Sequence, residues 1–232
     1  MSPMTSAAVS PAASSDLAID VVSDVVCPWC YIGKRRLEQA LAELREREPA
    51  LTPKVRWHPF QLDPTVPSGG ADRRAYREAK FGSAARVAEI HARIDAAGRG
   101  VGLEFAFDAI TRQPNTLDAH RLIAWAQTQG GVPDVDALVE GLFRAFFVEG
   151  RDIGDRAELA RVAADAGADP VAARALLDSQ LLAAEIAAAN ERAHGLGIGG
   201  VPFIIFDGKA AVSGAQEPAV LLEAIATARE RE

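Results

Sequence analysis

The spacing of apolar residues changes twice in the first quarter of the chain. Residues 17–23 place Leu17, Ile19 and Val21 on one face of an extended segment, a period of two that predicts a buried strand. Residues 32–47 then place apolar side chains three or four positions apart in a stretch rich in Arg and Glu, which predicts a helix. Residues 55–62 return to a strand-like composition, although Pro59 interrupts them. This part of the chain therefore predicts a β-α-β unit.

Helical spacing dominates the middle of the chain, from residue 72 to about residue 194. No part of this stretch shows the pattern of a strand, and glycine or proline residues stand where the helices should end. The expected helices cover residues 75–82, 84–97, 116–129, 135–148, 156–166 and 171–193. Together they predict a separate helical block.

The strand pattern returns near the end of the chain. Residues 202–206 form a short apolar run, Asp207 and Gly208 favour a hairpin turn, and residues 210–213 supply the returning strand. A last helix is expected over residues 217–229. The order is thus β-α-β, a large all-helical insertion, then β-β-α, which predicts an α/β fold.

The ends of these units set the expected domain boundaries. Residues 1–16 are rich in Ala, Ser and Pro, contain no Lys or Arg, and lack the apolar core of a signal peptide, so a disordered tail is expected there. Residues 17–62 and 195–232 are expected to form one domain, and residues 63–194 the helical insertion domain. No stretch approaches the roughly 18 consecutive apolar residues that span a membrane, so we expect a cytoplasmic protein.

Composition narrows the classes of partner. The chain has 232 residues and a formal net charge of -7, which gives no electrostatic reason to expect nucleic acid or an anionic membrane surface. Proteins and small molecules therefore remain as partners. Nothing in the sequence predicts an oligomeric state.

The chain has only two cysteines, Cys27 and Cys30, which stand where the first strand passes into the first helix. A disulfide scaffold would spread more cysteines along the chain, whereas a close pair in a reducing compartment is typical of redox or metal chemistry. A zinc site needs two further ligands, and the four histidines are scattered, so no metal is expected. Two inert buried cysteines are the other alternative, which Pro28 between them disfavours.

The sequence Cys-Pro-Trp-Cys suits disulfide exchange. Cys27 stands at the N-cap, where backbone N–H groups and the helix dipole stabilise a thiolate. Pro28 fits the first helical position because its missing N–H would have had no partner there. Trp29 is left to cover the pair and to contact substrate, and Cys30 should be more buried and less acidic. We therefore expect Cys27 to attack the substrate disulfide and Cys30 to resolve the mixed disulfide, without a tightly bound cofactor.

Two separated segments carry a family resemblance. Residues 23–33 (SDVVCPWCYIG) resemble the active-site stretch of the DsbA-like thioredoxin-fold oxidoreductases, most closely the FrnE-type branch. Residues 199–203 (GGVPF) are similar to that family's loop before its third strand. The resemblance implies a thioredoxin fold with a helical insertion and a cis bond between Val201 and Pro202. It also implies that the backbone there lies beside the dithiol and binds an extended substrate segment.

The resemblance implies a thiol–disulfide oxidoreductase that acts on protein or small-molecule disulfides, with a low-molecular-weight thiol as a candidate co-substrate. Periplasmic DsbA proteins commonly have His where this chain has Trp29, and a His there stabilises the thiolate, so we expect a reductase or isomerase rather than a strong oxidase.

Two alternatives stay open. A related branch comprises glutathione-dependent isomerases of aromatic acids with Ser at the position of Cys27, and residues 107–116 are similar to both branches. A thiol-cofactor-dependent isomerase or oxidoreductase of an aromatic or polyketide-like small molecule is therefore the second hypothesis. A non-catalytic binder that uses the apolar surface around Trp29 is the third.

Two polar residues could also contribute. Asp24 lies three residues before Cys27 and could accept a proton, but an acid at a strand end more often makes a local hydrogen bond. His120 lies on a predicted helix and could face the dithiol, although a helical histidine is more often a packing or surface residue. Neither is included in the predicted catalytic set.

Overall fold

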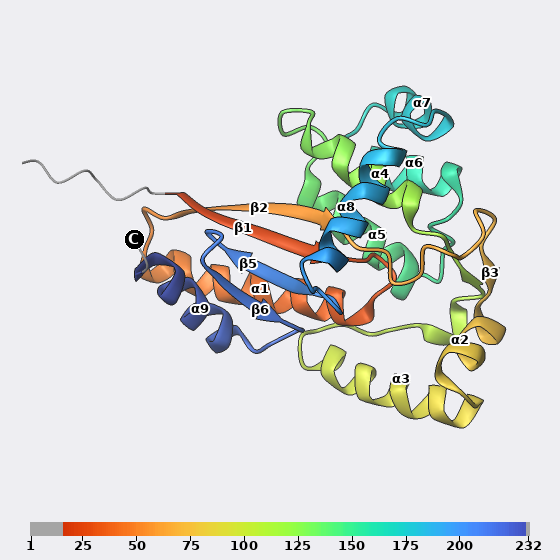
Figure 1. The fold of residues 1–232 in the computed structure, drawn as a ribbon, viewed down its shortest axis with the longest axis horizontal. Helices are drawn as coiled ribbons and strands as arrows, with labels where there is room; N and C mark the ends of the chain where they lie inside the picture. The colour runs from red at the N-terminus through yellow and green to blue at the C-terminus, as the bar shows by residue number, and fades with distance from the viewer. Residues whose placement is uncertain (1–15, 231–232) are drawn as a thin grey trace, which may run out of the picture.

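The computed structural model describes residues 16–230. The disordered tail expected over residues 1–16 lies outside these residues except for Asp16, which belongs to the first strand instead. Four strands form the main sheet in the order β2-β1-β5-β6 (Figure 1). Their bounds are β1 (Asp16–Ser23), β2 (Thr52–Pro59), β5 (Phe203–Phe206) and β6 (Ala210–Ser213). Strand β1 pairs in parallel with β2 and antiparallel with β5, which in turn pairs antiparallel with β6.

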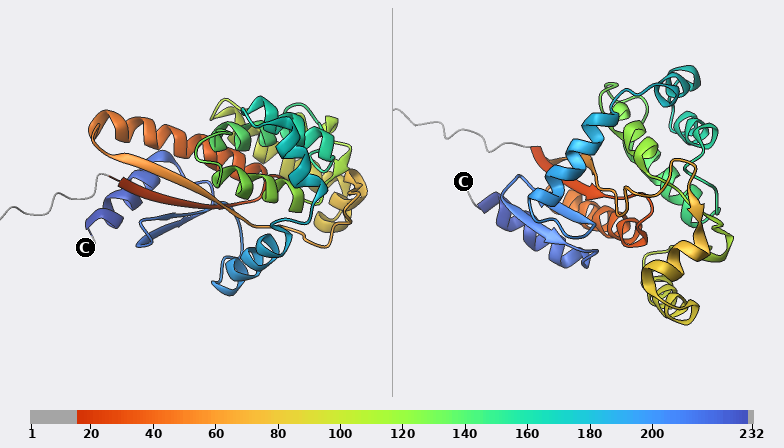
Figure 2. Two further views of the ribbon diagram at one scale, coloured as in Figure 1. Left: turned by 90° about the horizontal axis from the view of Figure 1, so that it is seen from above. Right: turned by 45° about the vertical axis from the view of Figure 1, so that its right-hand side comes forward.

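Helices cover both faces of this sheet. Leu17, Ile19 and Val21 of β1 belong to the large buried core that includes α1 (Pro28–Arg47) and α9 (Pro218–Glu230). The next residue, Val22, points to the opposite face and lies in a second cluster with side chains that include one from α8 (Ala183–Gly195). Figure 2 shows α1 and α8 on opposite sides of the sheet. The period of two in β1 therefore separates the two layers.

Most of the remaining helices come from the segment between β2 and α8. They are α2 (Arg73–Phe81), α3 (Ala84–Arg99), α4 (Leu117–Gln127), α5 (Val135–Phe147), α6 (Arg156–Asp165) and α7 (Pro170–Asp178). Two short antiparallel strands, β3 (Ala71–Asp72) and β4 (Arg112–Gln113), and a short 3-10 helix, η1 (Phe107–Ala109), also lie there, where only helices were expected. Two residues per strand are too few to leave an alternating pattern in the sequence.

An aromatic contact joins the sheet layer to this segment. Tyr31 of α1 stacks on Phe143 of α5, with ring centroids 4.9 Å apart and an interplanar angle of 9°. Both side chains belong to one buried core that runs from β1 into α5, α6 and α7. The division of the chain into two domains stays a prediction. No helix in residues 16–230 has the length and apolar character that a membrane span requires.

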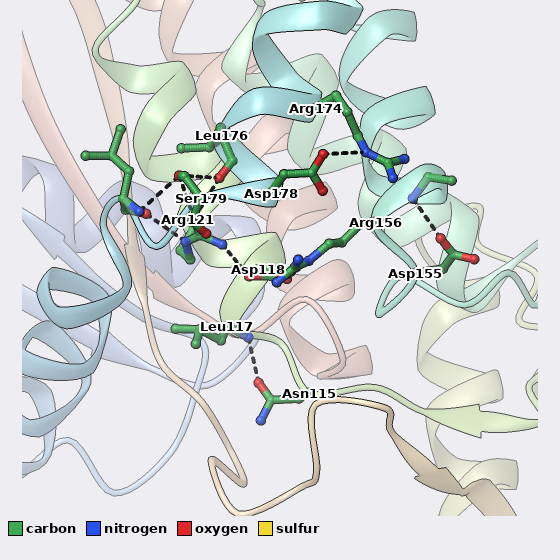
Figure 3. A network of polar contacts seen from close by, with 12 residues as sticks. Asn115, Leu117, Asp118, Arg121, Asp155, Arg156, Arg174, Leu176, Asp178 and Ser179 are labelled. Carbon is green, nitrogen blue, oxygen red and sulfur yellow. Dashed lines mark hydrogen bonds and ion pairs between the residues drawn. The ribbon is translucent and has the colours of Figure 1, made fainter.

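The single helix expected over residues 171–193 is wrong, because the chain breaks between α7 and α8. Arg121 of α4 donates to the carbonyl oxygens of Leu176 and Leu181, each 2.7 Å away, and to that of Ser179 at 2.9 Å (Figure 3). Leu182, immediately before α8, has the left-handed backbone angle φ of 66°. The break therefore satisfies a buried guanidinium from another helix, which local periodicity does not record.

The second strand is also displaced from its expected position over residues 55–62. It begins at Thr52 and ends at Pro59, and Phe60 donates its N–H to the Ser23 carbonyl 3.0 Å away. The strand ends at Pro59, but Phe60 still packs with Val22 of β1 in the second buried cluster. By contrast, the hairpin between β5 and β6 agrees with its sequence, since Asp207 and Gly208 both have positive φ.

Candidate active site

Cys27 lies between β1 and α1 as the N-cap residue of that helix. Its backbone angles are extended, with φ of -94° and ψ of 112°, and Pro28 occupies the first helical position as expected. The Cys27 carbonyl accepts the N–H of Cys30 at 3.0 Å, which closes the first turn around the two cysteines. Cys27 makes no side-chain capping bond. Its thiol is therefore free to interact outside the helix.

The thiol of Cys27 instead lies 3.6 Å from the Val201 carbonyl oxygen, to which it donates a weak hydrogen bond. Val201 begins the expected cis bond to Pro202, and that bond is cis. A methyl group at Gly33 of α1 would meet the Pro202 ring at 2.8 Å, so only glycine lets the loop pack this closely. The two motifs that were far apart in the sequence therefore meet at Cys27.

Cys30 is the more deeply buried thiol of the pair. Its exposed fraction is 1%, against 5% for Cys27, and the structure has both cysteines as free thiols. Burial, assisted by the hydrogen bond and charge of neighbouring Cys27, raises the pKa of the Cys30 thiol well above its ordinary value. Trp29, by contrast, is 38% exposed. The motif thus presents one inner thiol, one outer thiol and an exposed indole.

A cavity of about 310 Å³ opens beside the outer thiol. Cys27, Pro28, Trp29 and Val201 line it, and most of the other lining residues come from α2, α3, residues 107–116 and the loops that hold Asp24 and Asp63. All the sequence-predicted site residues except Cys30 and Pro202 therefore face this one cavity. Pro202 packs behind it against α1, and Cys30 lies buried in the core.

The structure also brings together the two polar residues that sequence reasoning set aside. His120 Nε2 lies 3.3 Å from Asp24 Oδ1, and both side chains are buried. Asp24 also accepts the backbone N–H of Leu62 at 2.8 Å and lines the cavity, so it fixes the loop that follows β2. His120 reaches this carboxylate from α4, and 96 residues separate the two in the chain. Only a three-dimensional structure reveals such a pairing.

Sequence reasoning missed two further cavity residues, Arg73 and Arg77 of α2. Both are almost fully buried, with exposed fractions of 8% and 6%. Their spacing of four in a helix could have placed them on one face, but nothing in the pattern showed that the face is buried. Residues 16–230 contain no group of three or more His, Cys, Asp or Glu placed to hold a metal ion.

The chain is similar to known proteins over most of its length. Residues 18–226 match the DsbA-like thioredoxin domain family. The crystal structure of a probable DsbA oxidoreductase from Streptomyces coelicolor is 30% identical, with a TM-score of 0.81, and the match covers 93% of this chain and 91% of that one. The uncharacterised protein YwbO of Bacillus subtilis is 26% identical over 162 residues, which cover 70% of this chain and 72% of YwbO.

A third protein shares the fold at lower identity. The cytosolic disulfide reductase DsbM of Pseudomonas aeruginosa, solved with glutathione, is 19% identical with a TM-score of 0.60, and the match covers 92% of this chain and 96% of DsbM. The family match extends over nearly all of the described residues and includes Cys27, Cys30 and the cis-proline loop. The chain therefore belongs to the DsbA-like thioredoxin domain family and is an enzyme of the thiol–disulfide oxidoreductase class.

Proposed function

We propose that the protein is a cytoplasmic disulfide reductase or isomerase that exchanges disulfides through Cys27 and Cys30. The observation that carries this proposal is the position of the Cys27 thiol, which lies at the start of α1, beside the Val201 carbonyl and on the wall of the cavity. A thiolate placed at a helix N-terminus is stabilised by the helix dipole. The fold shared with cytosolic DsbM supports the proposed compartment.

The proposed reaction has two exchange steps. The Cys27 thiolate attacks one sulfur of the substrate disulfide, so that a bond forms between the two sulfurs and the second substrate sulfur leaves and takes up a proton. Cys30, once deprotonated, then attacks Cys27 and releases the first substrate thiol. The substrate gains two electrons and the dithiol loses two, leaving a disulfide between Cys27 and Cys30.

A further turnover needs a reductant, for which we propose a low-molecular-weight thiol. Two thiol molecules reduce the pair by the same exchange steps in reverse and become a disulfide. The glutathione in the DsbM structure supports this class of co-substrate. The walls around Pro28, Trp29, Val201 and Pro202 are proposed to bind the substrate beside the reacting sulfur.

The test is an equilibrium titration of the protein in glutathione buffers of graded redox potential, followed by mass-spectrometric counting of free thiols. We expect a reversible two-electron transition with a midpoint of roughly -200 to -270 mV. A midpoint near -120 mV would contradict the reductase assignment, because that is the range of a strong oxidant. A pair that never titrates would contradict disulfide exchange altogether.

Insulin reduction tests the role of each thiol. Cys27→Ser should abolish it, whereas Cys30→Ser should retain a single attack but lose turnover. These two variants are matched controls, because each removes one sulfur and keeps the other. Survival of insulin reduction in Cys27→Ser would refute the assignment of Cys27.

A small-molecule activity is the second candidate, and the cavity beside Cys27, which is of a size for a small molecule, favours it. In this reaction a bound thiol cofactor would do the chemistry, so Cys27→Ser would retain activity on an aromatic acid in the presence of glutathione. Loss of that activity together with insulin reduction would favour disulfide exchange instead.

A further inference from the structure

Two buried arginines form part of the cavity wall beside Cys27. Arg73 and Arg77 lie one helical turn apart on α2, and both line the cavity that Cys27 lines. Their side chains are more than nine-tenths buried. Guanidinium groups are rarely buried to this extent unless a carboxylate or a set of carbonyl oxygens accepts their hydrogen bonds.

Neither arginine has an acidic partner within residues 16–230. No carboxylate there pairs with either guanidinium, and the Nε atoms of both side chains are buried without a hydrogen-bond partner. Arg73 donates to the amide oxygen of Gln113. Arg77 lies over the ring of Phe107, with its guanidinium carbon 5.6 Å from the ring centroid. A neutral amide and an aromatic ring compensate only part of a buried positive charge.

The two acidic residues of the cavity are engaged elsewhere. Asp24 contacts His120 and the Leu62 N–H, and Asp63 accepts the N–H of Thr65 at 3.0 Å. Lys80 also lines the cavity and adds a further positive charge to this wall. The charge balance of the cavity is therefore positive on the α2 side.

Burial shows how unfavourable this arrangement is without an anion. Desolvation, with the charge of Arg77, lowers the pKa of Arg73 to about 9, and desolvation lowers that of Arg77 to about 10. Both groups nevertheless remain protonated at neutral pH. Two like charges one helical turn apart also repel each other. A bound anion would relieve both the repulsion and the lost hydration.

The rest of the cavity is suited to an apolar group. Ile90 and Ile94 of α3 line it together with Phe81 and Phe107. A ligand that fits must therefore combine an acidic group with an apolar body, and Cys27 in the same cavity would react with sulfur.

We propose that this cavity binds an apolar small-molecule disulfide that carries a carboxylate, which Arg73 and Arg77 hold while its sulfur meets Cys27. The inference rests on the proposed function, since it names the substrate class of the same site. In the two exchange steps the dithiol is oxidised to the disulfide between Cys27 and Cys30, and the acidic disulfide is reduced to two thiols. The arginines bind and orient the substrate and take no proton.

The test compares two aromatic disulfides that differ in charge. Dithiobis(nitrobenzoate) carries carboxylates, whereas dithiodipyridine has none, and each releases a coloured thiol in a single turnover with the reduced protein. We expect Arg77→Gln to slow the reaction with dithiobis(nitrobenzoate) about tenfold or more, because it removes charge-assisted hydrogen bonds. The rate with dithiodipyridine should stay within about twofold of the wild type, because that reagent makes no use of the guanidinium.

A matched control lies on the same helix. Arg74 is exposed and does not line the cavity beside Cys27, so Arg74→Gln removes the same charge and should leave both rates within about twofold of the wild type. Arg77→Lys keeps the positive charge but lacks the two parallel N–H donors of a guanidinium. It should therefore recover part of the rate that Arg77→Gln loses. Equal losses for the two reagents in Arg77→Gln, or an equal loss in Arg74→Gln, would overturn the inference.

Ligand binding to a variant that lacks both thiols tests the anion site independently of disulfide exchange. In Cys27→Ser/Cys30→Ser, calorimetric titration should show that nitrobenzoate binds more tightly than uncharged nitrobenzamide, and that adding Arg77→Gln removes the difference. Equal affinity for the two compounds would overturn the anion site even if the dithiol is redox-active. A redox-inert wild-type pair would instead overturn the disulfide as the substrate class while leaving the measured anion site in place.

Discussion

Buried arginines in two regions of the molecule have very different surroundings. Arg121 of α4 donates to three backbone carbonyls at the break between α7 and α8. It also donates to Asp118, whose Oδ1 lies 2.6 Å away (Figure 3). Arg73 and Arg77, beside the dithiol, have no such set of acceptors. The guanidinium of Arg121 holds α4 to the segment between α7 and α8. The guanidiniums of Arg73 and Arg77 lack acceptors at the place where we propose that substrate binds.

The acceptors around a buried charge distinguish a structural role from a functional one. A buried charge that the protein itself satisfies stabilises one arrangement of helices. A buried charge that the protein leaves unsatisfied destabilises the free enzyme and is retained where a ligand completes it. The following substitutions test that distinction through folding stability.

Arg121→Met should give the largest effect. It leaves the carbonyls of Leu176, Ser179 and Leu181 without their donor and removes the ion pair to Asp118, so we expect a loss of about 3 kcal/mol in the free energy of unfolding. Urea denaturation followed by circular dichroism measures it. A loss of only a few tenths would show that the break between α7 and α8 does not depend on this guanidinium.

Arg77→Met should have the opposite sign. Methionine keeps the apolar contact with Phe107 and removes an uncompensated buried charge, so the free energy of unfolding should rise by about 1 kcal/mol. The same denaturation experiment applies, with Arg74→Met as the control for loss of an exposed charge from α2. If Arg77→Met destabilised the protein as much as Arg121→Met, the protein itself would satisfy the guanidinium of Arg77 as fully as it satisfies that of Arg121.

The smallest effect concerns His91 of α3, which stacks on Phe107 with ring centroids 4.1 Å apart. Burial, together with the charges of Arg77 and Arg73, lowers the pKa of His91 to about 4, while Asp108 opposes this shift. Because the unfolded chain takes up this proton near pH 6.5 and the folded protein does not, His91 makes the protein lose stability as the pH falls from about 6.5 to 4.

His91→Phe should therefore flatten the fall in stability across this acid range, and Arg77→Met should flatten it in part. Thermal unfolding at several pH values between 4 and 7 measures both effects. If stability fell with pH as steeply in His91→Phe as in the wild type, His91 would take up its proton in the folded protein as readily as in the unfolded chain.

Local sequence patterns predicted where the two cysteines lie in the fold. The alternation in β1, the helix after it and Pro28 at its first position placed Cys27 at an N-cap, and the structure confirms that position. The family resemblance, in turn, implied the cis bond before Pro202. Assignment to the FrnE-type branch stays a prediction.

The surroundings of the dithiol could not be predicted in the same way. Arg73 and Arg77 are ordinary helix residues in sequence, and only the packing of α2 near Phe107 and β4 buries them. The pairing of Asp24 with His120 likewise joins residues 96 positions apart. Such contacts depend on how helices pack, which a pattern of three to four residues does not specify.

Trapping the mixed disulfide shows which of the two thiols attacks first. Reduced Cys27→Ser and Cys30→Ser would each be mixed with dithiobis(nitrobenzoate), quenched with acid after a short interval and analysed by peptide mass spectrometry. We expect Cys30→Ser to accumulate the adduct on Cys27 rapidly, whereas Cys27→Ser should react far more slowly because the thiol of Cys30 is buried and its pKa is raised. Faster modification of Cys30 than of Cys27 would contradict the assignment of the attacking and resolving thiols.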